Sequence, residues 1–154
     1  MENNLDILTQ GESKKVKLVL KCFIIGVIAS VVTVLYRFAL AKAENFSFSM
    51  YSYVTENIWS IPLLFIGLGI TGFIVGKVIE IEPFSSGSGI PQVKAIMGGY
   101  LKENPISVII AKFAGGILAI LSGLSLGREG PSVQLGACVG DYVSKKFKSS
   151  KLER

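Results

Sequence analysis

Two glycine-rich turns hold the residues whose types and spacing could bind an ion. The first turn is Gly87-Ser88-Gly89-Ile90-Pro91, and the second contains Gly127, Arg128, Glu129, Gly130 and Pro131. In each turn a proline follows glycines. Proline is favoured at the first position of a helix, because its missing N–H would have no intrahelical partner there. Both turns therefore predict a helix N-terminus, where free N–H groups and the positive end of the helix dipole favour an anion.

The hydroxyl of Ser88 has two interpretations. It can donate a hydrogen bond to an anion held at the first turn. It can also accept a bond from the N–H groups of its own helix, as an N-cap serine does. The turn alone favours the cap.

Glu129 also has two interpretations. An ionisable side chain beside membrane helices typically marks an ion or proton path. An ionised carboxylate at a helix N-terminus would occupy the place of a free anion and would vacate it when protonated or displaced. Alternatively, Glu129 is a surface residue that forms an ion pair with Arg128. The residues by themselves leave the two interpretations balanced.

The elements that position these turns are apolar blocks. Residues 22–36 and 58–75 carry no charge, and Lys112 is the only charge within 106–126. A bilayer core of about 30 Å requires about 20 such residues in a helix. A secretory signal is a poorer interpretation of the first block, which is too long and carries Arg37 near its end. We therefore expect an all-α integral membrane protein, a polytopic bundle with broken helices. Its expected spans are 18–40, 58–79 and 106–126, and its expected short helices are 91–100 and 131–147.

Charge placement predicts the topology. Lysines crowd residues 14–21 and 145–154, which by the positive-inside rule places both ends in the cytoplasm of a multi-pass cell-membrane protein. We expect a cytoplasmic tail at 1–15, a basic cytoplasmic tail at 148–154 and an external loop at 41–57. Because the basic residues flank spans, they do not indicate a nucleic-acid partner.

Pairs of glycines four residues apart predict closely packed helix faces. These pairs are Gly72 with Gly76, Gly123 with Gly127, and Gly136 with Gly140.

Enzyme and metal-binding functions find little support. Gly123-Leu124-Ser125-Leu126-Gly127 matches a hydrolase elbow, but the chain contains no histidine to complete a Ser-His triad. Two separated cysteines, Cys22 and Cys138, do not form a metal-ligand set. We expect no enzyme activity, no metal and no cofactor.

The two turns, extended by Gln92-Val93 and by Ser132-Val133-Gln134-Leu135-Gly136, resemble the first two signature stretches of the CLC chloride channel and transporter family. Their order and the single span between them also match, and the resemblance covers residues 16–147. It implies that Ser88 coordinates a central anion within the turn of Gly87, Gly89, Ile90 and Pro91. It implies that Glu129 is the external gate and, in antiporters, a proton carrier. Backbone groups of Gly127, Arg128, Gly130 and Pro131 would line the outer anion site.

The resemblance implies selective chloride transport across a lipid bilayer, as a channel or as a chloride/proton antiporter, and a homodimer when the protein is full-length. Family members consist of two inverted halves, and this chain covers part of the first. We therefore expect the chain alone to lack a complete anion path. The alternative is a non-transporting truncated membrane protein, or a partner subunit of a split transporter.

Overall fold

The computed structural model describes residues 2–147, with side chains from residue 16 onward, and all regular structure in this range is helical. This confirms the all-α prediction. The helices are α1 (Glu2–Glu56), α2 (Ile61–Ile81), α3 (Ile90–Met97), α4 (Pro105–Leu121) and α5 (Glu129–Lys146), with 3-10 turns at Ile58–Ser60 and Pro83–Ser85.

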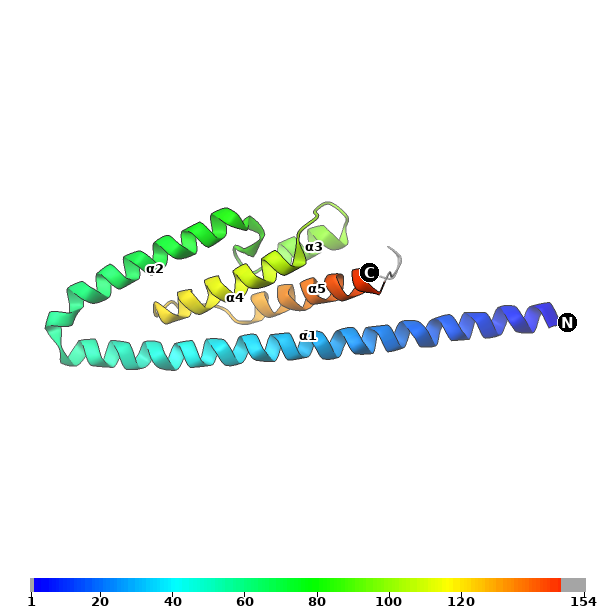
Figure 1. Ribbon diagram of the computed structural model, residues 1–154, viewed down its shortest axis with the longest axis horizontal. Helices are drawn as coiled ribbons and strands as arrows, with labels where there is room; N and C mark the ends of the chain where they lie inside the picture. The colour runs from blue at the N-terminus through cyan, green and yellow to red at the C-terminus, as the bar shows by residue number, and fades with distance from the viewer. Residues whose placement is uncertain (1, 148–154) are drawn as a thin grey trace.

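The bundle is built around α4 and α5. Figure 1 shows α1 running along one side of the molecule and α2 folding back along the other, with α4 and α5 between them. α1 packs against both α4 and α5, α2 packs against α4, and the short α3 packs against α5. Two helices that begin at glycine-rich turns, α3 and α5, are thus held side by side.

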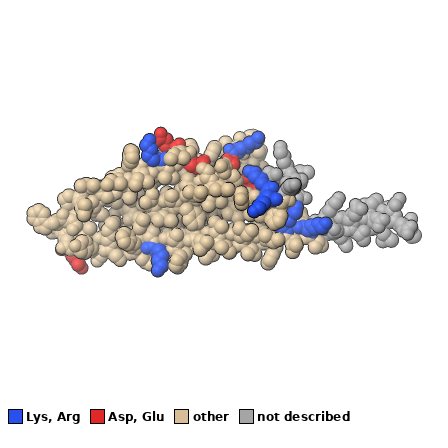
Figure 2. Space-filling model, viewed as in Figure 1, with Lys and Arg blue, Asp and Glu red and all other residues tan. Residues whose placement is uncertain are grey.

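One stripe of α1 faces this core. Tyr36, Leu40, Ala43 and Ser47 are buried and recur every three or four residues, the spacing of one helix face. Large apolar residues elsewhere on the helix, such as Phe38, are exposed. Figure 2 shows uncharged residues over most of the visible face. An exposed apolar surface of this kind is expected where lipid, and not water, surrounds a helix bundle.

Two of the helical segments are long and apolar enough to cross a membrane. They are Val16–Glu56 and Ile58–Ile81. The third expected span, 106–126, ends early: α4 stops at Leu121, where the chain turns and Gly123 adopts a positive φ of 80°. With 17 residues, α4 is about 26 Å long.

The loop conformation expected at 41–57 is wrong, because α1 continues to Glu56. Residues 41–56 contain neither glycine nor proline, so nothing local ends the helix. Contacts with the core also hold it, since the hydroxyl of Tyr51 donates to the carbonyl of Ser122 at 2.8 Å.

The expected boundaries of the tails and of the last helix also differ. The backbone of residues 2–15, the expected tail, belongs to α1, whereas residues 148–154 lie outside the described part of the chain. α5 begins at Glu129 and not at Pro131. Proline is tolerated at this third position because none of the first four N–H groups of a helix has an intrahelical acceptor.

Candidate anion site

The two glycine-rich turns touch each other. A Cβ atom on Gly130 would lie 2.7 Å from the Cβ of Ser88 and 2.8 Å from its carbonyl oxygen. Only a residue without a side chain allows this approach. The N-termini of α3 and α5 therefore converge on one point.

A second contact fixes the same arrangement. Gly89 is the N-cap of α3 with a φ of 80°, and a Cβ on it would lie 2.1 Å from the Oε1 of Gln134 in α5. The buried side-chain amide of Gln134 donates to the carbonyl of Phe84 at 2.8 Å. Thus α5 is tied both to the 3-10 turn at Pro83–Ser85 and to the glycine-rich turn at 87–91.

The structure does not place Ser88 at the N-cap. Gly89 holds that position, and Ser88 Oγ accepts only a long bond of 3.4 Å from the N–H of Ile90. The interpretation of Ser88 as the N-cap residue is therefore wrong. Its O–H donates to no acceptor among the described residues, so it is available to a ligand.

The second turn is anchored to α1. The guanidinium of Arg128 forms an ion pair with Glu44, and the hydroxyl of Ser132 donates to the carbonyl of Arg128 at 2.6 Å. Because Arg128 pairs with Glu44, the alternative interpretation of Glu129 as the ion-pair partner of Arg128 is wrong. The exposed carboxylate of Glu129 has no hydrogen-bond or ion-pair partner within the described residues.

The second turn also leaves donors free. Backbone N–H groups from Gly127 to Gly130 have no acceptor in the part of the chain that the structure describes. Free N–H groups at a helix N-terminus are suited to an anion.

Both turns border one cavity of about 340 Å³. Ser88 lines it from the first turn, and Gly127, Gly130 and Pro131 line it from the second. A neighbouring hollow shares Gly127 and Gly130 with this cavity and contains Glu129, together with Arg37 and Arg128. Glu129 thus lies in the adjoining hollow and is not among the residues that line the cavity.

Lys112 is the functional candidate that sequence reasoning missed. Its side chain is 5% exposed, and its ammonium donates to the carbonyl oxygens of Ser85 and Gly87 at 2.8 Å each. Lys112 lines the cavity, and no other charged residue does so among those described. The available signal was its position as the only charge in an apolar block of 21 residues, since such a buried charge requires specific partners.

Comparisons with known proteins identify the family of the chain. The model of a family described as voltage gated chloride channel matches residues 70–154, more than half of the chain. A probable chloride channel protein of Mycosarcoma maydis is 32% identical over 117 residues, covering 72% of this chain and 10% of the relative. The H(+)/Cl(-) exchange transporter 3 of Homo sapiens is 30% identical over 110 residues, covering 70% of this chain and 13% of the relative. The H(+)/Cl(-) exchange transporter ClcA of Vibrio campbellii is 39% identical over 92 residues, covering 59% of this chain and 19% of the relative.

No solved structure matches the chain. The chain spans between about a tenth and a fifth of the length of these three relatives. The family match includes both turns, α4 and α5. On this evidence, the chain belongs to the voltage gated chloride channel family and contains the segment in which two helix N-termini meet.

Proposed function

We propose that this chain supplies part of the anion pathway of a chloride channel or chloride/proton antiporter. In this proposal the turns at 87–91 and 127–131 bind chloride, and Glu129 is the gate. The relatives are named as a chloride channel and as exchange transporters of protons and chloride. These names support a transport function. Because the chain covers only a small part of each relative, the activity of the whole protein is a proposal.

One observation carries the proposal, namely the contact between Ser88 and Gly130. It brings the positive ends of α3 and α5 to the same cavity, and each end contributes a partial charge of about +0.5. Broken helices whose N-termini face a common site are an established way to bind an anion within a membrane.

The charge of Lys112 supports the same ligand. The cavity wall carries this one ammonium and no carboxylate among the described residues. A positive wall at low dielectric favours an anion far more than the same charge would in water. Lys112 also holds the first turn in place through Ser85 and Gly87, so it supports both the charge and the shape of the site.

Glu129 is suited to gating because of where its carboxylate lies. It is the first residue of α5 and lies in the hollow that adjoins the cavity. Ionised, it competes with a free anion for the N-terminus of α5; protonated, it no longer does so. The proton-exchanging relatives support a role for Glu129 in carrying protons.

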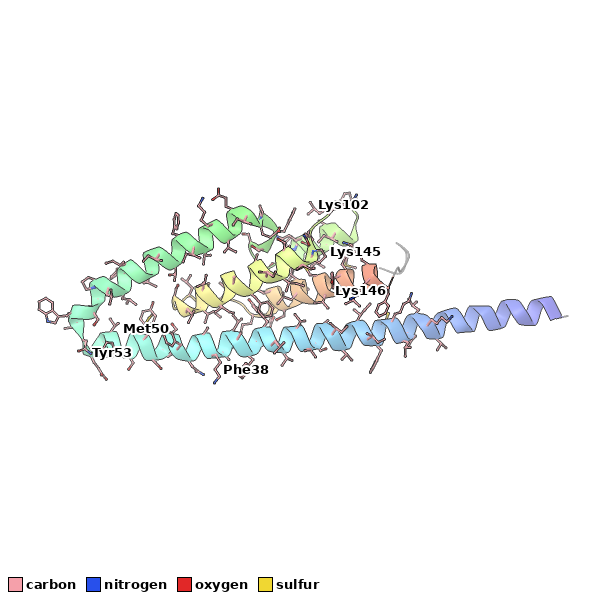
Figure 3. All side chains as sticks on the ribbon, viewed as in Figure 1. Phe38, Met50, Tyr53, Lys102, Lys145 and Lys146 are labelled. Atoms are coloured by element: carbon pink, nitrogen blue, oxygen red, sulfur yellow. The ribbon has the colours of Figure 1, made fainter. Side chains whose placement is uncertain are left out.

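We further propose that the lysine-rich end of the bundle faces the cytoplasm of the cell membrane. In Figure 3, Lys102, Lys145 and Lys146 lie toward the end of the bundle from which the N-terminal part of α1 extends, and Met50 and Tyr53 lie at the opposite end. The positive-inside rule assigns the first end to the cytoplasm. The homodimer expected of the full-length protein stays a prediction.

A chimera tests the proposed function. Residues 70–154 would replace the corresponding segment of the Vibrio campbellii exchange transporter ClcA, and chloride and proton fluxes would be measured in proteoliposomes. We expect the chimera to exchange chloride for protons. We expect Glu129→Gln to keep chloride flux and to lose proton coupling. Glu80→Gln is the matched control, because this exposed carboxylate pairs with Lys77 and does not line the cavity.

Two results would contradict the proposal. A chimera that is inserted and folded but passes no chloride would mean that this segment does not form an anion path. Proton coupling that survives Glu129→Gln would mean that Glu129 is not the gate.

A further inference from the structure

Three exposed lysines at one end of the bundle have no counter-ion among the described residues. Lys94 belongs to α3, Lys102 to the segment between α3 and α4, and Lys146 to the end of α5. The ammonium group of each forms no ion pair and no hydrogen bond within the part of the chain that the structure describes. In Figure 2, Lys and Arg side chains gather toward this end, where α5 stops.

The carboxylates next to these lysines in the sequence do not neutralise them. The side chain of Glu103 turns inward, since its Oε1 accepts a hydrogen bond from the thiol of Cys138 at 3.1 Å and its Oε2 is buried. Asp141 forms an ion pair with Lys145. The surface formed by the three unpaired lysines, called here the basic face, is therefore positively charged.

Two large side chains project from the same part of the chain. Met97 is 83% exposed and Tyr100 is 87% exposed, and both lie between Lys94 and Lys102 in the sequence. The ring of Tyr100 packs over Gly98, where a Cβ atom would lie 2.7 Å from it. Tyrosine is enriched where lipid headgroups meet acyl chains. Lysines next to such residues are typical of a surface that contacts anionic lipids.

Lipid satisfies both parts of this surface. The helices α1 and α2 are long and apolar enough to cross a membrane, and charges at the end of such a bundle lie at the depth of the lipid headgroups. Phosphate oxygens of the headgroups accept hydrogen bonds from ammonium groups, and the adjoining acyl chains cover exposed apolar side chains.

We propose that the basic face binds the headgroups of anionic phospholipids in preference to zwitterionic ones. The inference does not depend on the proposed anion pathway, because none of the three lysines lines the cavity.

Quenching of tryptophan fluorescence by brominated lipids tests this preference. The single tryptophan, Trp59, is 97% exposed in the turn that joins α1 and α2 at the opposite end of the bundle, and residues 43–76 contain no basic residue. A reporter variant combines Trp59→Phe with Tyr100→Trp, which moves the only tryptophan to the basic face. The whole chain and the reporter variant are each reconstituted in vesicles of phosphatidylcholine and phosphatidylglycerol, and one lipid at a time is brominated.

The anionic lipid should quench the Tyr100→Trp reporter in preference. We expect phosphatidylglycerol to be favoured about fivefold at low salt, the effect of one basic residue near an anionic surface. Replacing all three lysines of the basic face with glutamine should abolish the preference, as should 1 M salt, which shortens the screening length to about 3 Å. Lys42→Gln is the matched control, because this exposed lysine lies over the ring of Phe38, away from the basic face (Figure 3). This control should keep the preference of the reporter, and Trp59 of the unsubstituted chain should show none.

Three results would overturn the inference. Equal quenching of the reporter by the two lipids would mean that the basic face does not select anionic headgroups. A preference that survives the three lysine substitutions would have another origin. An equal preference at Trp59 would mean that the anionic lipid collects around the whole chain. No anion flux is measured, so these results do not decide the proposed transport function.

Discussion

Gly130→Ala tests the meeting of the two turns most sharply. The added methyl group would lie 2.7 Å from the Cβ of Ser88, about 1 Å inside the optimal separation of two carbon atoms. The obstacle includes the backbone of Ser88, whose carbonyl oxygen and Cα would lie at 2.8 and 3.0 Å, so rotation of a side chain cannot relieve it. Overpacking of this kind typically costs about 1–3 kcal/mol. The variant should unfold more easily and bind bromide, a substitute for chloride in titration calorimetry, more weakly, because the turns must separate.

Gly136→Ala provides the control on the same helix. A Cβ at this position meets nothing within 4 Å, so only the intrinsic helix preference of alanine should act, and it stabilises by about 1 kcal/mol. Thermal unfolding in detergent micelles, followed by circular dichroism, measures both variants. The melting temperatures should move in opposite directions. Equal melting temperatures would refute the conclusion that Gly130 lies against Ser88.

Three further substitutions test the groups around the cavity. Lys112→Met leaves two carbonyl oxygens without a donor. We expect the free energy of unfolding to fall by about 2–4 kcal/mol and bromide binding to weaken. An unchanged stability and an unchanged bromide affinity would contradict the role of Lys112. Arg128→Gln breaks a half-exposed ion pair with Glu44, and the change in stability should be no more than about 1 kcal/mol; a larger loss in thermal unfolding would show that the pair does more than anchor the turn. Glu129→Gln removes an anionic competitor, so bromide affinity measured at neutral pH should rise; a fall would mean that the carboxylate does not compete with the anion.

Local chemistry explains what could be predicted from the sequence. Glycines followed by proline predict a helix N-terminus wherever they occur, so the starts of α3 and α5 were located to within two residues. Long uncharged blocks likewise predicted the helical fold. These features depend on neighbours in the chain and not on distant contacts.

The details of packing depend on distant contacts and could not be predicted in this way. Glycines four residues apart suggested close helix faces, yet Cβ atoms on Gly72 and Gly76 would meet nothing within 4 Å. Gly123, from another predicted pair, does meet a distant side chain, since its Cβ would lie 2.6 Å from Tyr51. Close approach also occurs at Gly116 and Gly130, which belong to none of the predicted pairs, against residues 80 and 42 positions away in the sequence. No spacing rule within one helix identifies such partners.

The same limit applies to the site. Ser88 and Glu129 were recognised because they belong to the turns themselves. Lys112 reaches the cavity from the interior of α4, and its position as the only charge of an apolar block does not reveal that its partners are Ser85 and Gly87. The pair between Arg128 and Glu44 could not be predicted for the same reason, because Glu44 lies 84 residues away.

The central claim is that the two turns form one anion site. Anomalous X-ray diffraction from crystals of the chain soaked in bromide tests it most directly, since bromide scatters anomalously and chloride sites commonly accept it. We predict a bromide peak in the cavity, within hydrogen-bond distance of the Ser88 hydroxyl and of the N–H groups between Gly127 and Gly130. Bromide peaks found only beside exposed lysines, with none in the cavity, would contradict the claim.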